Sequence, residues 1–188
     1  KAFLSNRQPD FSPSPKNQMG TWLAIHLPRL ALEVLTGGTE ISVPFAVIGE
    51  KPKCCLLACN KRAEDKGLRV GMTLSAAFAL ASDLRAKERD EVEEKSALQA
   101  LAGWATQFTS LVSLASPQAL LLEVGGSERL FCGVQLLTEV IEQGLRQLGY
   151  SARVAVAPTP LAALLLSRAG AGTRSQPHSM AGDLASIS

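Results

Sequence analysis

A single stretch, SPQALLLEVGGSERLFCG at residues 116–133, constrains the fold more than any other part of the chain. It opens with the turn pair Ser116-Pro117, continues through residues of strand character at 119–124, and ends on Gly125-Gly126. A helix is expected to begin near Val134, directly after it. In open α/β sheets the place where a strand gives way to a helix is a common location for chemistry, so we expect this stretch to have the shape of a functional site.

The entrance of this stretch lacks the groups that a metal-dependent site needs. Gln118 and Ala119 stand where two acids would be required, because hard divalent cations prefer carboxylate oxygens. The sequence contains no P-loop and no dinucleotide-binding glycine pattern. It also offers no nucleophile with a base beside it, since His178, one of the two histidines, falls in a tail of weak structural signal.

Length and composition suit one domain or two small ones. The chain has 188 residues, of which 46% are hydrophobic and only 5% aromatic, so the expected core is aliphatic. No apolar run approaches the roughly 18 residues of a membrane span. Residues 1–18 are rich in Pro, Ser, Asn and Gln, and we expect a disordered or non-native extension there, with Met19 as a plausible native start.

The cysteines and the charge leave two alternatives open. Cys54, Cys55 and Cys59 crowd one expected strand and Cys132 lies far away, which favours buried thiols in the reducing cytoplasm over a disulfide framework or a zinc site. The net charge of +2 is low for a dedicated nucleic-acid binder. The basic residues between 51 and 69 form either a solvated face or a phosphate-facing patch.

Hydrophobic periodicity predicts alternating strands and helices. Strands are expected at 22–27, 44–49, 54–59, 111–115, 119–124 and 152–157. Helices are expected after Pro28, at 63–66, after Thr73, at 91–108, at 134–148 and after Thr159. The apolar face of the helix at 134–148 is predicted to comprise Val134, Leu137, Ile141, Leu145 and Leu148. The face of the last helix is predicted to comprise Leu161, Leu164, Leu165 and Arg168.

This order predicts an α+β fold, with a sheet covered by helices on one face and a small subdomain inserted after the first strand and helix. The larger part is assigned to residues 19–37 and 88–170, and the insertion to residues 38–87. Residues 171–188 are expected to be a flexible tail or the start of a further domain.

Four segments carry a resemblance to a known family: PFAVIG, LACNKRAEDKGLRVGMTLSAAFAL, the central stretch at 116–133, and AVAPTPLAALLLSRAG. In this order they resemble the palm and fingers of Y-family translesion DNA polymerases, the UmuC/DinB group, over about residues 21–170. The resemblance implies a palm with a mixed or antiparallel sheet, formed by the larger part, and fingers formed by the insertion. The tail would then begin the missing thumb.

In that family three carboxylates hold two divalent metals that activate the primer hydroxyl and neutralise the triphosphate. The resemblance places the first acid position on His26 and the following pair on Gln118 and Ala119, none of which is an acid. It places the triphosphate contacts on Lys61, Glu64 and Leu164. A carboxylate or a leucine there cannot replace a phosphate-binding cation, so we expect no catalytic residue, no metal and no nucleotide site.

Each degenerate position also has a simpler interpretation. His26 at the end of a buried strand is typical of a hydrogen-bonded core histidine, and Gln118 of a polar turn residue. The alternative to lost catalysis is an active error-prone polymerase with displaced acids, which would be Glu33, Glu123 and Glu128. Glu123 lies about 13 Å beyond Ala119 along a strand, so these acids are not expected to converge. Mg²⁺ would be a cofactor only under this alternative.

The resemblance is strongest to a polymerase-like subfamily of bacterial damage-induced (SOS) mutagenesis. It implies a non-catalytic scaffold or adaptor in translesion synthesis and DNA repair. The implied partners are a RecA-like companion protein, an error-prone C-family DNA polymerase, the sliding clamp and RecA. No clamp-binding motif of the usual Gln-x-x-Leu/Met-x-Phe/Leu kind is visible, and DNA binding is expected to be weak and to depend mainly on regions beyond the palm and fingers.

Overall fold

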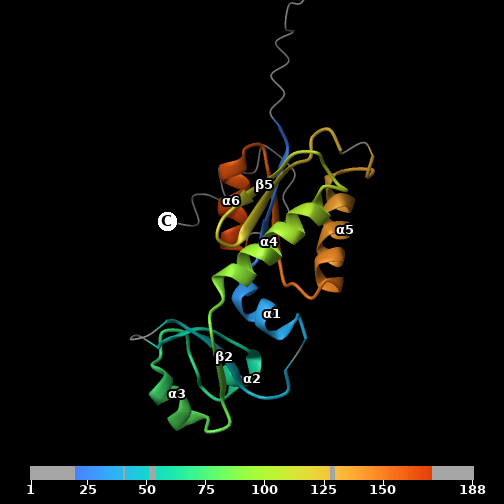
Figure 1. The fold of residues 1–188 in the computed structure, drawn as a ribbon. Coiled ribbons are helices and arrows are strands. Elements are labelled where there is room, and N and C mark those ends of the chain that lie inside the picture. The colour runs from blue at the N-terminus through green and yellow to red at the C-terminus, as the bar shows by residue number, and fades with distance from the viewer. Residues whose placement is uncertain (1–19, 40, 51–53, 128–129, 171–188) are drawn as a thin grey trace, which may run out of the picture.

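The computed structural model describes residues 20–39, 41–50, 54–127 and 130–170. These residues form a larger part built on one sheet and a smaller part built on a second sheet, with helix α1 between them (Figure 1). The expected N-terminal extension at 1–18, the candidate acid Glu128 and the tail at 171–188 lie outside the described residues.

The larger part is built on four strands in the order β5-β6-β1-β7. They are β1 (Trp22–His26), β5 (Val112–Ala115), β6 (Ala119–Glu123) and β7 (Arg153–Ala157), and every neighbouring pair is antiparallel. Strand β6 lies between β5 and β1, so the strand of the central stretch is internal to the sheet. Its continuous apolar sequence, ALLLE, suits a strand that is covered by other elements.

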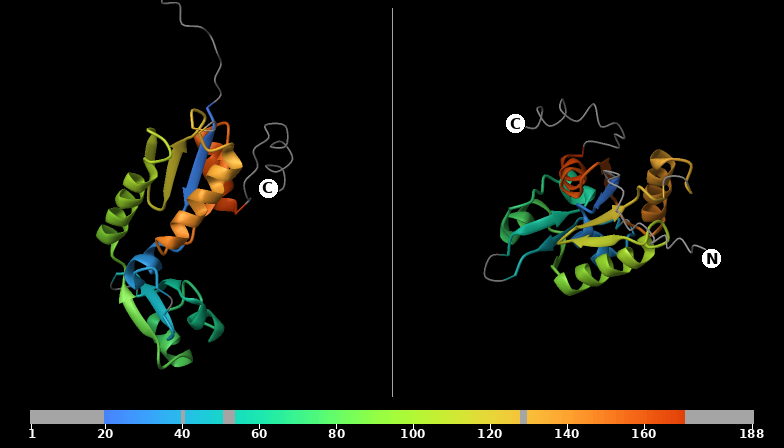
Figure 2. Two further views of the ribbon diagram at one scale, coloured as in Figure 1. Left: turned by 90° about the vertical axis from the view of Figure 1, so that its right-hand side faces the viewer. Right: turned by 90° about the horizontal axis from the view of Figure 1, so that it is seen from above.

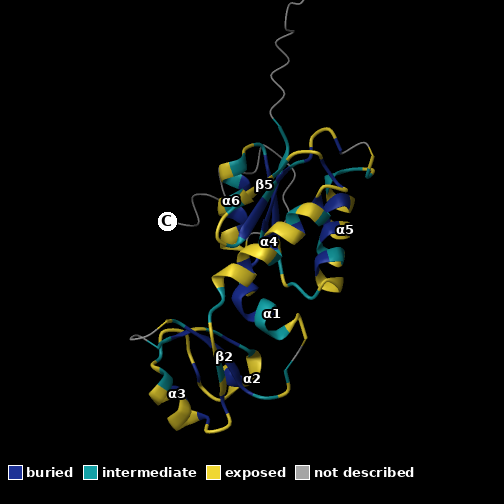
Figure 3. Ribbon diagram, in the orientation of Figure 1, coloured by how far each residue is buried: buried dark blue, intermediate teal, exposed yellow. Residues whose placement is uncertain are grey.

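Helices cover both faces of this sheet (Figures 2 and 3). Leu23 and Ile25 of β1 face a core completed by α4 (Glu91–Ala105) and α5 (Val134–Gln147). Ala24 points the other way and packs with alanines of β7 against α6 (Pro160–Ala169). The α+β class is therefore confirmed, whereas the expected placement of helices on one face is wrong for α6. Alternation of large and small residues along β1 allows both faces to be covered.

The buried faces of the last two helices differ in part from those predicted. On α5, Leu137, Ile141 and Leu145 are fully buried as predicted, but Leu148 follows the end of the helix and is 46% exposed. On α6 the buried residues are Ala163, Leu166 and Ser167. Leu161 and Leu165 are exposed, contrary to prediction, because the small residue Ala163 faces the alanines of the sheet and turns these leucines toward solvent.

The smaller part contains a three-stranded sheet in the order β3-β2-β4, with β2 (Phe45–Ile48), β3 (Leu56–Cys59) and β4 (Arg85–Glu88). Two short helices pack on it, α2 (Lys61–Asp65) and α3 (Leu74–Leu80). Strand β4 has no counterpart in the sequence prediction. Its sequence, RAKE, has no apolar alternation, and it is a strand because its backbone pairs in parallel with β2.

Helix α1 (Leu30–Thr36) connects the two cores. Leu30 belongs to the core of the larger part, while Ala31 and Leu32 pack with Phe45 and Val47 of the smaller sheet. The N-terminus of α1 follows β1 by only a few residues, so this helix holds the smaller part against the end of the larger sheet. Within the part of the chain that the structure describes, no helix has the length and apolarity needed to cross a bilayer.

Candidate functional site

The three positions where the resemblance expects acids lie together at one end of the larger sheet. His26, the last residue of β1, stands opposite Ala119 at the start of β6. The backbone N–H of Leu27 donates a 2.8 Å hydrogen bond to the carbonyl of Gln118. The hairpin between β5 and β6 thus presents residues 118 and 119 beside His26, because antiparallel pairing brings the end of β1 next to the start of β6.

A cavity of about 170 Å³ opens at this end of the sheet. Its lining consists of His26, Pro117, Gln118, Ala119 and Arg168. The last of these comes from the C-terminal turn of α6, which leaves the opposite end of β7 and runs back along the sheet. Below, this space is called the His26 cavity.

The electrostatic character of the His26 cavity is positive. Arg153 stands opposite His26 on β7, on the side away from Ala119, and its Nη1 donates a 3.1 Å hydrogen bond to the carbonyl of Arg168. Burial lowers the pKa of His26 below its ordinary value of 6.5, and the charges of Arg153 and Arg168 lower it further. The neutral imidazole is therefore favoured, and its buried Nδ1 has no hydrogen-bond partner among the described residues.

These residues do not fit the pair of divalent metals that the fold family implies. The side chains available are one imidazole and one amide, and two guanidinium groups repel a cation. In the described ranges no group of three or more His, Cys, Asp or Glu residues is arranged to hold a metal ion. The described residues at the positions where the resemblance expects acids therefore lack the donor set of a two-metal site.

Two of the three candidate displaced acids lie elsewhere. Glu123 is at the other end of β6, opposite Trp22, and its Oε1 accepts a 3.1 Å hydrogen bond from the N–H of Gly125. Glu33 on α1 is 8% exposed, and its Oε1 accepts a 3.0 Å hydrogen bond from the N–H of Ser151. Neither side chain lines the His26 cavity.

In the smaller part, Asn60 organises the turn that carries the predicted triphosphate contacts. Its Oδ1 accepts hydrogen bonds from the N–H groups of Phe45 and Ala63, both 3.0 Å, and so caps α2. Its Nδ2 donates to the carbonyl of Val43 at 2.8 Å. Sequence analysis did not identify Asn60, although Asn directly before a helix is a recognisable cap signal.

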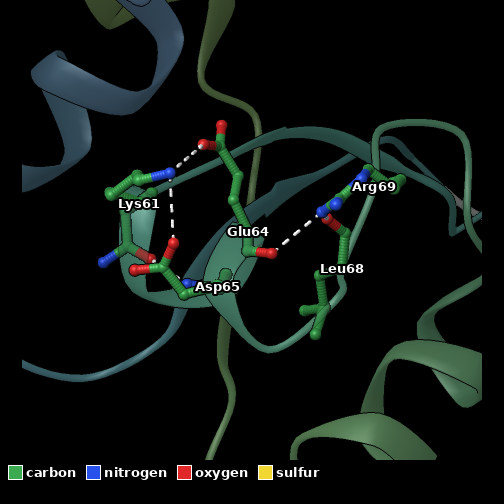
Figure 4. A network of polar contacts seen from close by, with 7 residues as sticks. Lys61, Glu64, Asp65, Leu68 and Arg69 are labelled. Carbon is green, nitrogen blue, oxygen red and sulfur yellow. Dashed lines mark hydrogen bonds and ion pairs between the residues drawn. The ribbon is translucent and has the colours of Figure 1, made fainter.

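Lys61 and Glu64 lie on α2 and are occupied by local contacts (Figure 4). The Nζ of Lys61 is 3.1 Å from Oδ1 of Asp65 and 4.0 Å from Oε2 of Glu64. Arg69 folds back so that its Nη1 donates to the carbonyls of Glu64 and Leu68, at 2.9 and 2.7 Å. The negative charges beside Lys61 weaken it as a phosphate ligand.

A second cavity, of about 210 Å³, lies between α1, the start of α2 and the turn that follows α5. Arg29, Glu33, Lys61, Arg62 and Ser151 line it, together with smaller and apolar residues. Oε2 of Glu33 is buried there without a hydrogen-bond partner among the described residues. Lys61 therefore belongs to this cavity, while His26, Gln118 and Ala119 belong to the other.

Leu164 on α6 is half-buried and lines neither cavity. Arg168, one turn later, does line the His26 cavity, and sequence analysis placed it only on an apolar helix face. Arg153 was not identified at all. The signal in the sequence for these residues was one arginine at the start of a strand and another near the end of the next helix. These two positions come together only when the helix packs on the sheet.

Comparisons with known proteins agree with this architecture. A sequence model of the impB/mucB/samB family (IMS) matches residues 41–168. The Protein ImuB of Caulobacter vibrioides, strain NA1000 / CB15N, is 32% identical over 104 residues, which are 55% of this chain and 23% of the relative. The same match is found with Protein ImuB of Caulobacter vibrioides strain ATCC 19089 / CIP 103742 / CB 15. The match thus spans less than a quarter of these curated relatives.

Solved structures of Y-family polymerases share the fold at low sequence identity. The post-insertion binary complex of Dbh DNA polymerase superimposes with a TM-score of 0.70 and 16% identity, covering 87% of this chain and 50% of that one. DinB from Sulfolobus solfataricus gives a TM-score of 0.65 and 16% identity, covering 85% of this chain and 49% of that one. The chain is similar to ImuB in sequence, has the fold of the palm and fingers of a Y-family DNA polymerase, and belongs to the impB/mucB/samB family.

Proposed function

We propose that this chain is part of a non-catalytic, polymerase-like subunit of a bacterial complex for DNA-damage-induced translesion synthesis, where it acts as a scaffold or adaptor. The observation that carries the proposal is the chemistry of the His26 cavity. His26, Gln118 and Ala119 stand at the positions of the expected acids, and Arg168 lines the same space. A site of this charge opposes the binding of the two metals that nucleotide transfer requires.

The smaller part supports the same proposal independently. Glu64 stands at a position expected to hold a cation for the triphosphate, and Lys61 is paired with Asp65 at 3.1 Å. A change in the metal site alone could be compensated by a shifted ligand. Changes at the metal site and at the phosphate contacts together leave neither metal binding nor triphosphate binding supported.

The partners follow from the similarity to ImuB and are proposals as well. They are an ImuA-like RecA-family protein, an error-prone C-family DNA polymerase, the sliding clamp and RecA, with action in the cytoplasm. Weak DNA binding is proposed to depend mainly on regions beyond the palm and fingers. A side-by-side pull-down with this chain and the full-length protein would assign each partner to this part or to the remainder.

Primer extension by the full-length protein tests the loss of catalysis. With a primed template, all four deoxynucleotides and either Mg²⁺ or Mn²⁺, we expect no metal-dependent extension above a no-enzyme control. A Y-family polymerase with its acids intact serves as the positive control in the same buffer. Extension that requires metal and is abolished by Glu33→Gln or Glu123→Gln would establish the alternative, an active error-prone polymerase with displaced acids.

A further inference from the structure

The His26 cavity combines two features that point to an anion, its volume and the positive charges beside it. It is about 170 Å³ in volume and therefore large enough for several waters or for a tetrahedral oxyanion. Arg168 lines it, and Arg153 is close enough for its charge, like that of Arg168, to act on His26. Nδ1 of His26 is buried, with no hydrogen-bond partner among the described residues, so the imidazole can face the cavity only with its other ring atoms.

Neither arginine of this pair is in an ion pair with an acid of the described residues. The hydrogen bond from Nη1 of Arg153 to the carbonyl of Arg168 uses one of the N–H donors of Arg153 and does not involve the guanidinium of Arg168. It also ties the last turn of α6 to the start of β7. Two guanidinium charges next to a cavity at the end of a sheet attract an oxyanion and repel a divalent cation.

We propose that the His26 cavity binds a phosphate group, held directly by Arg168 together with His26 and the amide of Gln118, with Arg153 as a positioning residue. A phosphate near neutral pH carries a charge between −1.5 and −2, roughly, and accepts hydrogen bonds at several oxygens. This matches two guanidinium charges and several N–H donors better than the single charge of a carboxylate does. The cavity would thus hold an anion where active relatives hold metal cations.

The inference rests on the proposed loss of the metal site, because bound metals would occupy the same space. Different experimental outcomes would contradict the proposed loss of the metal site and the proposed phosphate site. Primer extension by the full-length protein would overturn both, whereas a protein that neither extends primers nor binds phosphate would overturn only the present inference.

Proton NMR of the histidine rings tests the inference directly. The chain has two histidines, His26 and His178. We expect inorganic phosphate, titrated at constant ionic strength, to shift the ring resonance of His26 in a saturable way and to raise its pKa, because a nearby anion stabilises the imidazolium. Chloride at the same ionic strength should do neither, and Mg²⁺ should leave the resonance in place.

Matched variants distinguish phosphate binding in the His26 cavity from a general effect of the protein's positive charge. Arg168→Gln should weaken phosphate binding by about tenfold or more, the usual effect of losing a charged hydrogen bond, and should raise the pKa of His26 in the absence of phosphate. Arg85→Gln removes the same charge from β4 of the smaller sheet and should change neither. Arg168→Lys, which keeps the charge, should bind phosphate with intermediate affinity. Partial binding by this variant would show that a loss in Arg168→Gln does not come from misfolding.

Two oligonucleotides distinguish the source of the phosphate. A short strand with a 5′-phosphate that binds more tightly than both inorganic phosphate and the same strand without it would assign the ligand to a nucleic-acid end. Equal affinity for the phosphorylated strand and inorganic phosphate would assign it to a free phosphate. A His26 resonance that does not respond to phosphate, or an Arg85→Gln variant as impaired as Arg168→Gln, would overturn the proposal.

Discussion

His26 replaces an expected acid with a base whose charged form is disfavoured by its surroundings. Burial is the larger cause of the lowered pKa, and Arg153 and Arg168 add to it. In the unfolded chain the imidazole returns to its ordinary pKa of 6.5. As the pH falls below that value, the unfolded state takes up a proton that the folded state does not, so stability is lost between 6.5 and the lower folded pKa.

We therefore predict that His26→Gln reduces the pH dependence of stability. The free energy of unfolding of the unmodified chain should fall as the pH is lowered from about 7.5 to about 5, and the variant should lose less over the same range. Urea unfolding at several pH values measures this difference, and carboxylates that titrate below this range affect both proteins alike. Parallel curves for the two proteins would show that His26 has an ordinary pKa in the folded state.

At the scale of the elements, the approach of α4 and α5 depends on a glycine. Gly144 on α5 lies against the ring of Trp104 on α4, so that a Cβ at position 144 would overlap Cζ2 of that ring. The ring cannot move freely, because it packs edge-on against Phe108 with centroids 5.1 Å apart. Gly103 on α4 has no atom within 4 Å of the place a Cβ would take.

These two glycines provide a matched pair of variants. Gly103→Ala should stabilise the protein by about 0.5–1 kcal/mol, because alanine has the higher helix propensity. Gly144→Ala has the same propensity gain but should destabilise the protein, since overpacking costs about 1–3 kcal/mol. Thermal or urea unfolding of both variants measures the difference. Equal effects of the same sign would mean that α4 and α5 can separate without cost.

An ion pair joins the smaller part to the larger one. Nε and Nη2 of Arg89, directly after β4, donate to the two carboxylate oxygens of Glu94 in the first turn of α4, both at 2.7 Å. The side chain of Glu94 is only 4% exposed. This bidentate pair therefore fixes the point at which the chain passes from one sheet to the helix of the other.

Removing the arginine should be costly. Arg89→Ala leaves a buried carboxylate unpaired, and we expect a loss of about 3 kcal/mol in the free energy of unfolding. Lys66→Ala removes a pair of similar length, Lys66–Asp83 at 2.6 Å, in which both side chains are about half exposed, and should cost less than about 1 kcal/mol. Denaturant unfolding compares the two. A loss in Arg89→Ala as small as that in Lys66→Ala would show that Glu94 becomes hydrated.

For the whole molecule, the proposed loss of catalysis predicts that acids introduced at positions 26, 118 and 119 alone give no polymerase activity. His26→Asp, Gln118→Asp and Ala119→Glu would place three carboxylates at one end of the sheet. Arg153 and Arg168 would remain beside them and pair with the new acids in competition with the metals.

The triple variant should therefore remain inactive in primer extension. Activity is expected only after Glu64→Arg and Leu164→Lys are added, because each lost charged hydrogen bond to the triphosphate costs on the order of 1.5–3 kcal/mol. Circular dichroism checks that each variant is folded. Robust metal-dependent extension by the triple variant would show that the smaller part still binds nucleotide and that only the metal site is degenerate.

Most of the element order could be read from the sequence, because its signals are local. Alternation of apolar residues, Thr159 before Pro160 and Gly37 after α1 specify elements through contacts between near neighbours. The grouping of His26 with residues 118 and 119 was available only through the resemblance to a family. Strand β4 was not predictable, because its four polar or small residues become a strand only by pairing with β2.

The sequence by itself thus determined every strand except β4, the helices and several of their caps, and the resemblance to a family added the expected acid positions at His26, Gln118 and Ala119. Only the tertiary structure decided the side of the sheet that α6 covers and, with it, the charge of the site. Arg153 and Arg168 are 15 residues apart in the chain, and neither marks a site in the sequence. They act on His26 together because β7 and α6 pack antiparallel and bring a strand start and a helix end to one place, and long-range packing of this kind leaves no local pattern in a sequence.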